Sequence, residues 1–111
     1  MYNQNINIME LNKNSGGEIT LEQAQRYVQA FRSKYPQEVK AFYVGINQIE
    51  NVLGQENCMG LRIYNGYEEK EARMNIVIVG VNSQGNDITS GIILDKTLPC
   101  PSYCDNSSPL M

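Results

Sequence analysis

The most apolar stretch of the chain, residues 74–81, constrains the fold more than any other segment. Its hydrophobic side chains alternate between two sets, with Ile76 and Ile78 in one and Val77, Val79 and Val81 in the other. Successive residues of a strand point to opposite faces, so both faces of a strand formed here are apolar. Such a strand is normally central in its sheet. We therefore expect a central strand, with the isoleucines on one face and the valines on the other.

A second strand is predicted directly upstream, where residues 59–64 alternate with a period of two. The charged connection between the two strands, residues 65–73, is short. Because parallel strands need a long crossover, we expect residues 60–66 and 74–81 to pair antiparallel as a central hairpin. Downstream, residues 87–95 fit either a strand or one turn of helix, and the pattern does not separate the two.

The clearest helix is predicted over residues 21–35. A capping box starts it, because the Thr20 hydroxyl can accept from the Gln23 N–H while the Gln23 side chain reaches back. Pro36 pushes Tyr35 out of the helical region and ends the helix. Apolar residues recur at helical spacing, at Leu21, Ala24, Val28 and Phe31. We expect this helix to pack across the sheet through Ala24, Val28 and Phe31.

Two shorter elements lie between the long helix and the hairpin. Residues 39–44 are rich in strand-forming side chains. A second helical stripe follows, with Gly54 as its C-terminal stop, and consists of Ile46, Ile49, Val52 and Leu53. Together the elements predict an α+β fold. Its small antiparallel sheet is built on the 60–66/74–81 hairpin, with one long and one short helix packed on it.

The chain is predicted to form a single α+β domain over residues 19–104. Residues 1–18 are rich in Asn and end in Ser-Gly-Gly, which indicates a flexible leader, and residues 105–111 form a tail. The leader lacks the basic start and apolar core of a secretory signal. No apolar run reaches the length of a membrane span. We therefore expect a cytoplasmic location and no membrane partner.

The composition excludes several classes of function. The chain has no histidine, so hydrolases built on Ser-His or Cys-His pairs are excluded. Its formal net charge is −3, which disfavours binding to the phosphate backbone of nucleic acids. Its glycines never assemble into a phosphate-binding loop. We expect no nucleic-acid partner, no catalytic residue and no cofactor.

Two cysteines lie close together in the ending Leu98-Pro-Cys-Pro-Ser-Tyr-Cys104. The flanking prolines, Pro99 and Pro101, stiffen the backbone around Cys100. A disulfide between Cys100 and Cys104 can close if the chain turns between them, which requires a Cα separation below about 7 Å. Two unpaired thiols are equally compatible with the sequence. Redox catalysis of the Cys-x-x-Cys type is disfavoured, because the spacing is one residue too long.

A metal site is a further possibility at these cysteines. Cys58, Cys100 and Cys104 would supply three ligands and Asp105 a fourth. Structural zinc sites usually contain two closely spaced pairs of ligands, whereas this chain has one such pair. We therefore expect no bound metal, and we expect Cys58 to pack apart from the other two as a small apolar residue.

The aromatic content is unusual, with seven tyrosines, two phenylalanines and no tryptophan. Tyrosine at a surface suits protein contacts, because its ring is large and rigid and carries a polar tip. Half-buried tyrosines that line the core are the alternative interpretation. We expect a small protein-binding module, for interaction or assembly, that has no catalytic activity and binds a protein partner or forms a homo-oligomer. The alternative is a small thiol- or metal-dependent module or enzyme centred on Cys100 and Cys104.

Four motifs carry a resemblance to a known family. They are Gly60-Leu-Arg-Ile-Tyr64, Ile78-Val-Gly80, Gly85-Asn-Asp-Ile88 and the cysteine-containing ending. In these motifs the chain resembles a family of short proteins from Bacteroidota-type bacteria, over about residues 19–104. The resemblance implies that the ending belongs to the domain. No activity is attached to this family, so the resemblance implies no functional residue.

Overall fold

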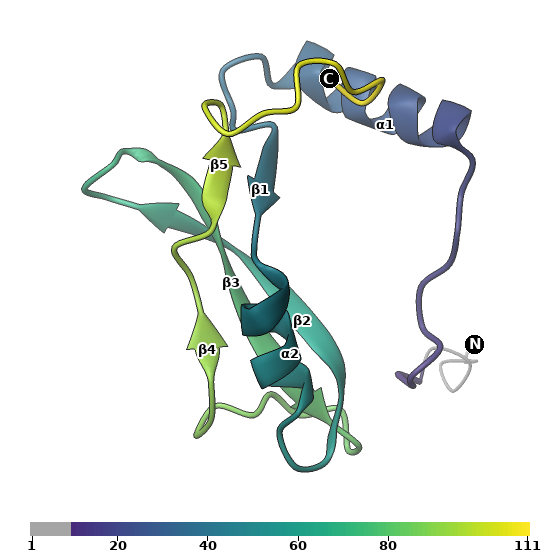
Figure 1. Ribbon diagram of the computed structural model, residues 1–111, viewed down its shortest axis with the longest axis vertical. Coiled ribbons are helices and arrows are strands. Elements are labelled where there is room, and N and C mark those ends of the chain that lie inside the picture. Colours follow the sequence, from purple (N-terminus) through teal and green to yellow (C-terminus); the bar gives the residue numbers. More distant parts are fainter. Residues whose placement is uncertain (1–9) are drawn as a thin grey trace, which may run out of the picture.

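The computed structural model describes residues 10–111 (Figure 1). These residues form two helices and five strands, in the order α1 (Leu21–Lys34), β1 (Ala41–Tyr43), α2 (Ile46–Leu53), β2 (Cys58–Glu68), β3 (Arg73–Asn82), β4 (Ile93–Leu94) and β5 (Leu98–Cys100). The strands pair antiparallel in two sheets, with the orders β1-β5 and β2-β3-β4. The predicted α+β class is therefore confirmed.

The central hairpin is confirmed, and it is longer than predicted. β2 and β3 pair from Cys58 opposite Asn82 to Glu68 opposite Arg73. Only residues 69–72 remain as the tip, so most of the expected charged connection is strand. The Glu68 carboxylate closes the tip by accepting hydrogen bonds from the backbone N–H groups of Lys70 (2.6 Å) and Glu71 (3.1 Å).

β3 is the central strand of its sheet, as its apolar composition predicts. β2 pairs with one side of it and β4 with the other, opposite Ile78 and Val79. Val79 and Val81 are buried on one face of β3 and Ile78 on the other. Pairing with β3 also resolves residues 87–95, which end in the short strand β4 rather than in a helix.

The second sheet and α2 cover part of the hairpin (Figure 1). β1 pairs with β5, and α2 follows β1 directly and packs on β2 and β3 through its fully buried Val52. This packing favours glycine at position 80 of β3. A Cβ on Gly80 would lie 3.0 Å from Cys58 Sγ and 3.3 Å from Val52 Cγ1. Gly80 therefore lies at the point where α2 approaches the hairpin most closely in this packing.

The local signals that define α1 are confirmed. The N-cap Thr20 hydroxyl accepts from the Gln23 N–H at 3.1 Å, and the Gln23 side chain accepts from the Thr20 N–H at 3.1 Å. The helix ends at Lys34, with Tyr35 as its C-cap before Pro36.

The predicted packing of the long helix, by contrast, is wrong. No residue of α1 is buried, and the exposed fraction of Phe31 is 37%. Figure 1 shows α1 at one end of the molecule, beyond the ends of β1 and β5. The C-terminal segment contacts α1 instead, because Gln25 Nε2 donates to the Pro109 carbonyl at 3.1 Å and Arg32 donates to the Leu110 carbonyl. The connection through Pro36 joins the C-terminus of α1 to the start of β1. The helix therefore lies beyond the end of that strand rather than across the face of a sheet.

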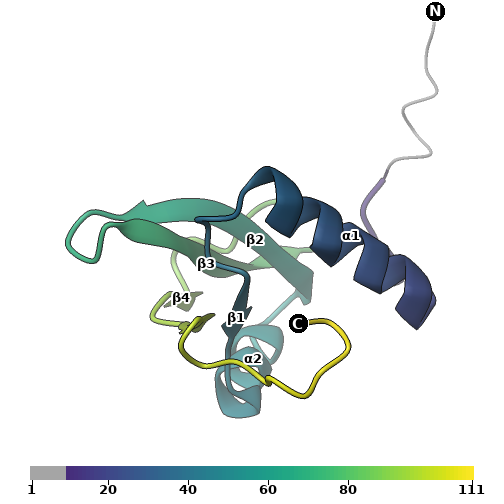
Figure 2. The same ribbon diagram turned by 90° about the horizontal axis from the view of Figure 1, so that it is seen from above.

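The molecule is more open than a compact domain of its length (Figure 2). Its radius of gyration is 16.3 Å, compared with about 13 Å for a compact chain of this size. The buried hydrophobic core consists of Val52, Ile78, Val79, Val81 and Cys100. Of the expected leader, residues 1–9 lie outside the described residues, and residues 10–18 contain a turn closed by the Ser15 N–H and the Asn12 carbonyl.

Candidate functional site

The cysteine ending closes as a disulfide. The Cα atoms of Cys100 and Cys104 lie 4.8 Å apart and their sulfur atoms are at bonding distance, which agrees with the expected reach. The turn between them is held by the Tyr103 N–H, which donates to the Pro99 carbonyl at 2.9 Å. Cys100 is buried in the core, and its sulfur lies 3.7 Å from that of Met111. In this arrangement the bridge joins the end of β5 to the tail and exposes no thiol.

The candidate metal ligands are not brought together. Cys58 lies on β2 beside Gly80, and its thiol donates to the Gly60 carbonyl at 3.3 Å. The Asp105 carboxylate accepts from the backbone N–H and the hydroxyl of Ser107. Within residues 10–111, no group of three or more cysteine, aspartate or glutamate side chains is placed to hold a metal ion. The geometry therefore offers no reason to assign a metal to these four residues.

Three polar side chains meet on β2 and the loop after β3. Arg62 and Tyr64 are two residues apart on β2, so they share a face, and both reach Asp87. Arg62 Nη1 lies 2.5 Å from Asp87 Oδ1, and the Tyr64 hydroxyl donates to Asp87 Oδ2. Arg62 also donates to the Gly85 carbonyl at 3.5 Å. The cluster ties the loop to the strand.

Mutual hydrogen bonding shifts the titration of all three groups. The hydrogen bond from Tyr64, followed by that from Arg62, lowers the pKa of Asp87. The same contact raises the pKa of Tyr64, and the Asp87 carboxylate raises the pKa of Arg62. Each charged or polar end already has a partner, so we interpret the cluster as structural. Its signal in the sequence was the two-residue spacing of Arg62 and Tyr64, but nothing local pointed to Asp87.

In the part of the chain that the structure describes, one side of β2 has no strand beside it. The sheet order β2-β3-β4 leaves this side free over an eleven-residue strand. Among the described residues, none forms a backbone hydrogen bond with residues 59–68 on that side. Residues 11–13 and 15 lie near the first part of β2 but contribute no backbone pairing. Large side chains are exposed along the strand at Ile63, Tyr64 and Tyr67. We call this side of β2 the free edge.

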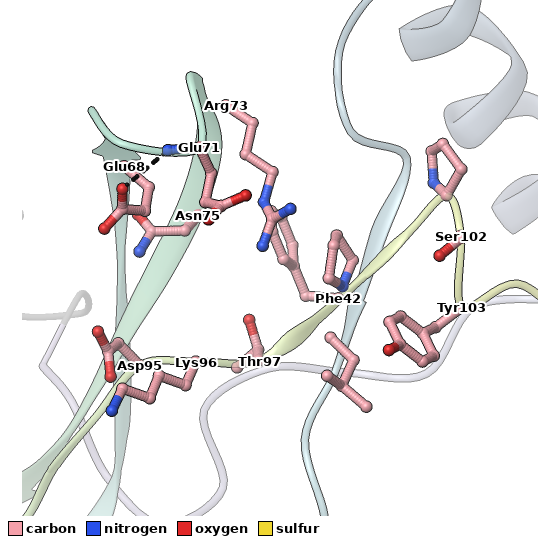
Figure 3. A pocket seen from close by; sticks show the side chains of 13 residues that line it. Phe42, Glu68, Glu71, Arg73, Asn75, Asp95, Lys96, Thr97, Ser102 and Tyr103 are labelled. Carbon is pink, nitrogen blue, oxygen red and sulfur yellow. Dashed lines mark hydrogen bonds between the residues drawn. The ribbon is translucent and has the colours of Figure 1, made fainter.

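A cavity of about 500 Å³ lies between the hairpin tip and the segment around β5 (Figure 3). Arg73, the first residue of β3, projects into the cavity. Thr97, the residue directly before β5, also projects into it. The Arg73 Nε atom and the Thr97 hydroxyl are both buried, and neither has a hydrogen-bond partner among residues 10–111. Sequence reasoning did not single out either residue, because a strand-end arginine and a threonine carry no local motif.

Comparison with known proteins returned no match to this chain, whether against family models, curated proteins or solved structures. The resemblance to the bacterial family accordingly remains a prediction. Within residues 10–111, neither helix has the length and apolar character needed to cross a lipid bilayer.

Proposed function

We propose that the chain is a protein-interaction module that assembles with a second copy of itself by pairing the free edges of their β2 strands. The observation that carries this proposal is the length of the free edge. β2 runs over Cys58–Glu68, and within residues 10–111 it has a hydrogen-bonded neighbour on one side only. The unpaired N–H and C=O groups of such an edge form hydrogen bonds readily with a strand from another chain.

Beyond the first part of β2, near which residues 11–13 and 15 lie, the free edge lacks the features that keep strand edges apart. Natural edge strands are commonly short, or they carry lysine, proline or a bulge that prevents pairing. β2 contains neither lysine nor proline. Its one cation, Arg62, is bound to Asp87. The irregular pairing between Cys58 and Gly60 affects only one end of the strand, so the remainder is regular.

The sequence of β2 is complementary to itself in the antiparallel direction, which favours a second copy as the partner. A two-fold axis at Ile63 places Arg62 of one copy opposite Tyr64 of the other, and Met59 opposite Tyr67. Arginine and methionine both make favourable contacts with aromatic rings. This register places no like charges opposite each other, and cross-strand pairs of this kind stabilise a sheet.

The open shape of the molecule also supports association. The radius of gyration exceeds that of a compact domain, and the exposed side chains of Ile63, Tyr64 and Tyr67 lie along the free edge. Pairing of two β2 strands would create one continuous sheet across both copies. It would also remove part of this apolar surface from water, which is the main driving force for most protein association.

Sedimentation equilibrium of the full chain across the micromolar range tests the proposal. We expect the wild-type protein to form a dimer. The Ile63→Lys variant should be monomeric, because the two-fold axis would place two lysines directly opposite each other. Ile46→Lys is the matched control, since Ile46 lies on α2 and is more exposed (70%) than Ile63 (57%). The control should dimerise like the wild type.

Two results would contradict this proposal. One is a wild-type chain that stays monomeric throughout the range, and the other is an Ile63→Lys variant that dimerises as the wild type does. The urea unfolding midpoints of both lysine variants should be measured alongside, so that a loss of dimer is not confused with a loss of folding.

A further inference from the structure

The cavity at the hairpin tip contains two unpaired polar groups that point into the same space. The exposed fraction of Thr97 is 7%, and its hydroxyl has no hydrogen-bond partner among the described residues. The Arg73 Nε atom is buried and unpartnered in the same way, and Arg73 forms no ion pair within residues 10–111. Figure 3 shows the Arg73 guanidinium and the Thr97 hydroxyl directed into the centre of the cavity.

These two groups have a common requirement. Buried polar atoms in proteins nearly always have a hydrogen-bond partner, and the exceptions call for an explanation such as a bound group. The Arg73 Nε–H can only donate, and the Thr97 hydroxyl can donate as well. A carboxylate accepts from both at once, and such charge-assisted hydrogen bonds are the strong ones.

The remaining charges favour a ligand that also carries a cation. Glu68, Glu71 and Asp95 line the cavity together with the cations Arg73 and Lys96, so carboxylates are in excess. A dianion such as phosphate would be repelled by this set of carboxylates. An ammonium group on the ligand would instead be attracted to the side of the cavity where Figure 3 shows Glu68 and Asp95.

The opposite side of the cavity is apolar. Phe42 and Tyr103 lie there, beside prolines of the cysteine ending. Binding sites for small molecules are usually apolar concavities of about 300–1,000 Å³ with a few placed polar groups. The volume of about 500 Å³ lies within this range.

We propose that this cavity binds a free α-amino acid with an apolar side chain. The carboxylate binds between the Arg73 guanidinium and the Thr97 hydroxyl, and the ammonium group faces Asp95 and Glu68. The side chain lies beside Phe42 and Tyr103. This site lies at the hairpin tip and does not depend on assembly through the free edge.

Three probes that share a phenyl ring separate the parts of this ligand. Phenylalanine carries both charged groups, 3-phenylpropionate only the carboxylate and 2-phenylethylamine only the ammonium. Their binding to the full chain is measured by titration calorimetry, and the site is located by amide shifts in NMR spectra. We expect phenylalanine to bind at least about tenfold more tightly than either of the others, because each lacks one charge-assisted contact. The shifts should concentrate in residues 68–75 and 95–103.

Two variants test the residues that carry the proposal. Thr97→Val removes the unpaired hydroxyl at nearly constant volume, so the free protein should be at least as stable as the wild type. Its affinity for phenylalanine should nevertheless fall by about 10- to 100-fold. Arg73→Gln should weaken binding to a similar extent. Thr89→Val and Arg26→Gln are matched controls at exposed positions and should bind as the wild type does.

Three results would overturn the proposal. The first is that none of the probes binds. The second is that 3-phenylpropionate or 2-phenylethylamine binds as tightly as phenylalanine, since the site would then not recognise a zwitterion. The third is that Thr97→Val and Arg73→Gln both retain the wild-type affinity. If one variant does not fold, the other still decides the outcome.

Discussion

At the scale of single residues, the Asp87 carboxylate is held by two side chains of β2. Arg62 and Tyr64 donate to different oxygens of its carboxylate, and both favour its charged form. Hydrogen bonding to the charged form lowers the pKa of an acid. The raised pKa of Tyr64 keeps its hydroxyl protonated, so this donor persists at neutral and mildly alkaline pH.

We predict that the contribution of Asp87 to stability disappears in acid. Its pKa is lowered on folding, so the contribution is present above the unfolded value of about 3.9 and is lost as pH falls through the folded value. Asp87→Asn has no such charge to lose. The difference between wild-type and Asp87→Asn urea midpoints should therefore be constant near neutrality and shrink below about pH 4. A difference that stays the same down to pH 3 would show that the charge of the Asp87 carboxylate does not stabilise the fold.

At the scale of secondary-structure elements, the two helices have opposite relations to the sheet. α2 is short, yet its Val52 is fully buried against the hairpin. α1 is longer and has a complete capping box, yet none of its residues is buried. The stability that a helix contributes to a domain comes mainly from the packing of its apolar face rather than from its length. α2 should therefore matter more to the folded state than α1.

Two alanine substitutions, one in each helix, test whether α2 contributes more to stability than α1. Val52→Ala should lower the free energy of unfolding by about 2 kcal/mol, because it leaves a cavity between α2 and the hairpin. Phe31→Ala removes a larger side chain but should cost only about 1 kcal/mol, well below the 3–5 kcal/mol typical of a fully buried phenylalanine. Phe31 is 37% exposed and contacts Tyr35 at a ring-centroid distance of 5.2 Å. Urea unfolding of both variants measures the two losses, and a larger loss for Phe31→Ala would mean that α1 is packed after all.

At the scale of the whole molecule, α1 and the C-terminal segment form an outlying part. The segment follows the disulfide and returns along α1, where Pro109 and Leu110 accept hydrogen bonds from Gln25 and Arg32. These hydrogen bonds join residues far apart in the sequence, but they bury no side chain of α1. Regions with few buried apolar contacts open more easily than the rest of a protein.

We predict that deletion of residues 105–111 loosens α1 and leaves the hairpin unchanged. An isolated helix of fourteen residues is marginal in water, so α1 depends on the contacts that the tail provides. Hydrogen exchange of the amides in α1 should accelerate in the truncated chain, whereas the protection of β2 and β3 should stay as in the full chain. Arg32→Ala in the full chain removes one of the contacts and should have a smaller effect in the same direction. Unaltered exchange in α1 would show that the tail does not support it.

The sequence alone determined those features that depend on neighbouring residues. Thr20 and Gln23 start α1 and Pro36 ends it, because capping and proline geometry act within one turn. Residues 74–81 predict a central strand because their period and composition are local properties. Cys100 and Cys104 approach each other because only three residues separate them and the chain turns between them.

Only the tertiary structure decided which of these elements meet. The apolar stripe of α1 was compatible with packing on the sheet, but the connection through Pro36 places α1 at the end of the molecule. Asp87 reaches Arg62, and Thr97 shares a cavity with Arg73, although nothing near either residue in the sequence indicates the other. Hydrophobic attraction has no preferred direction, so an apolar pattern shows which face of an element is suited to burial without stating against what, or how completely, that face is buried. The free edge and the cavity depend on which elements pack together in the folded chain.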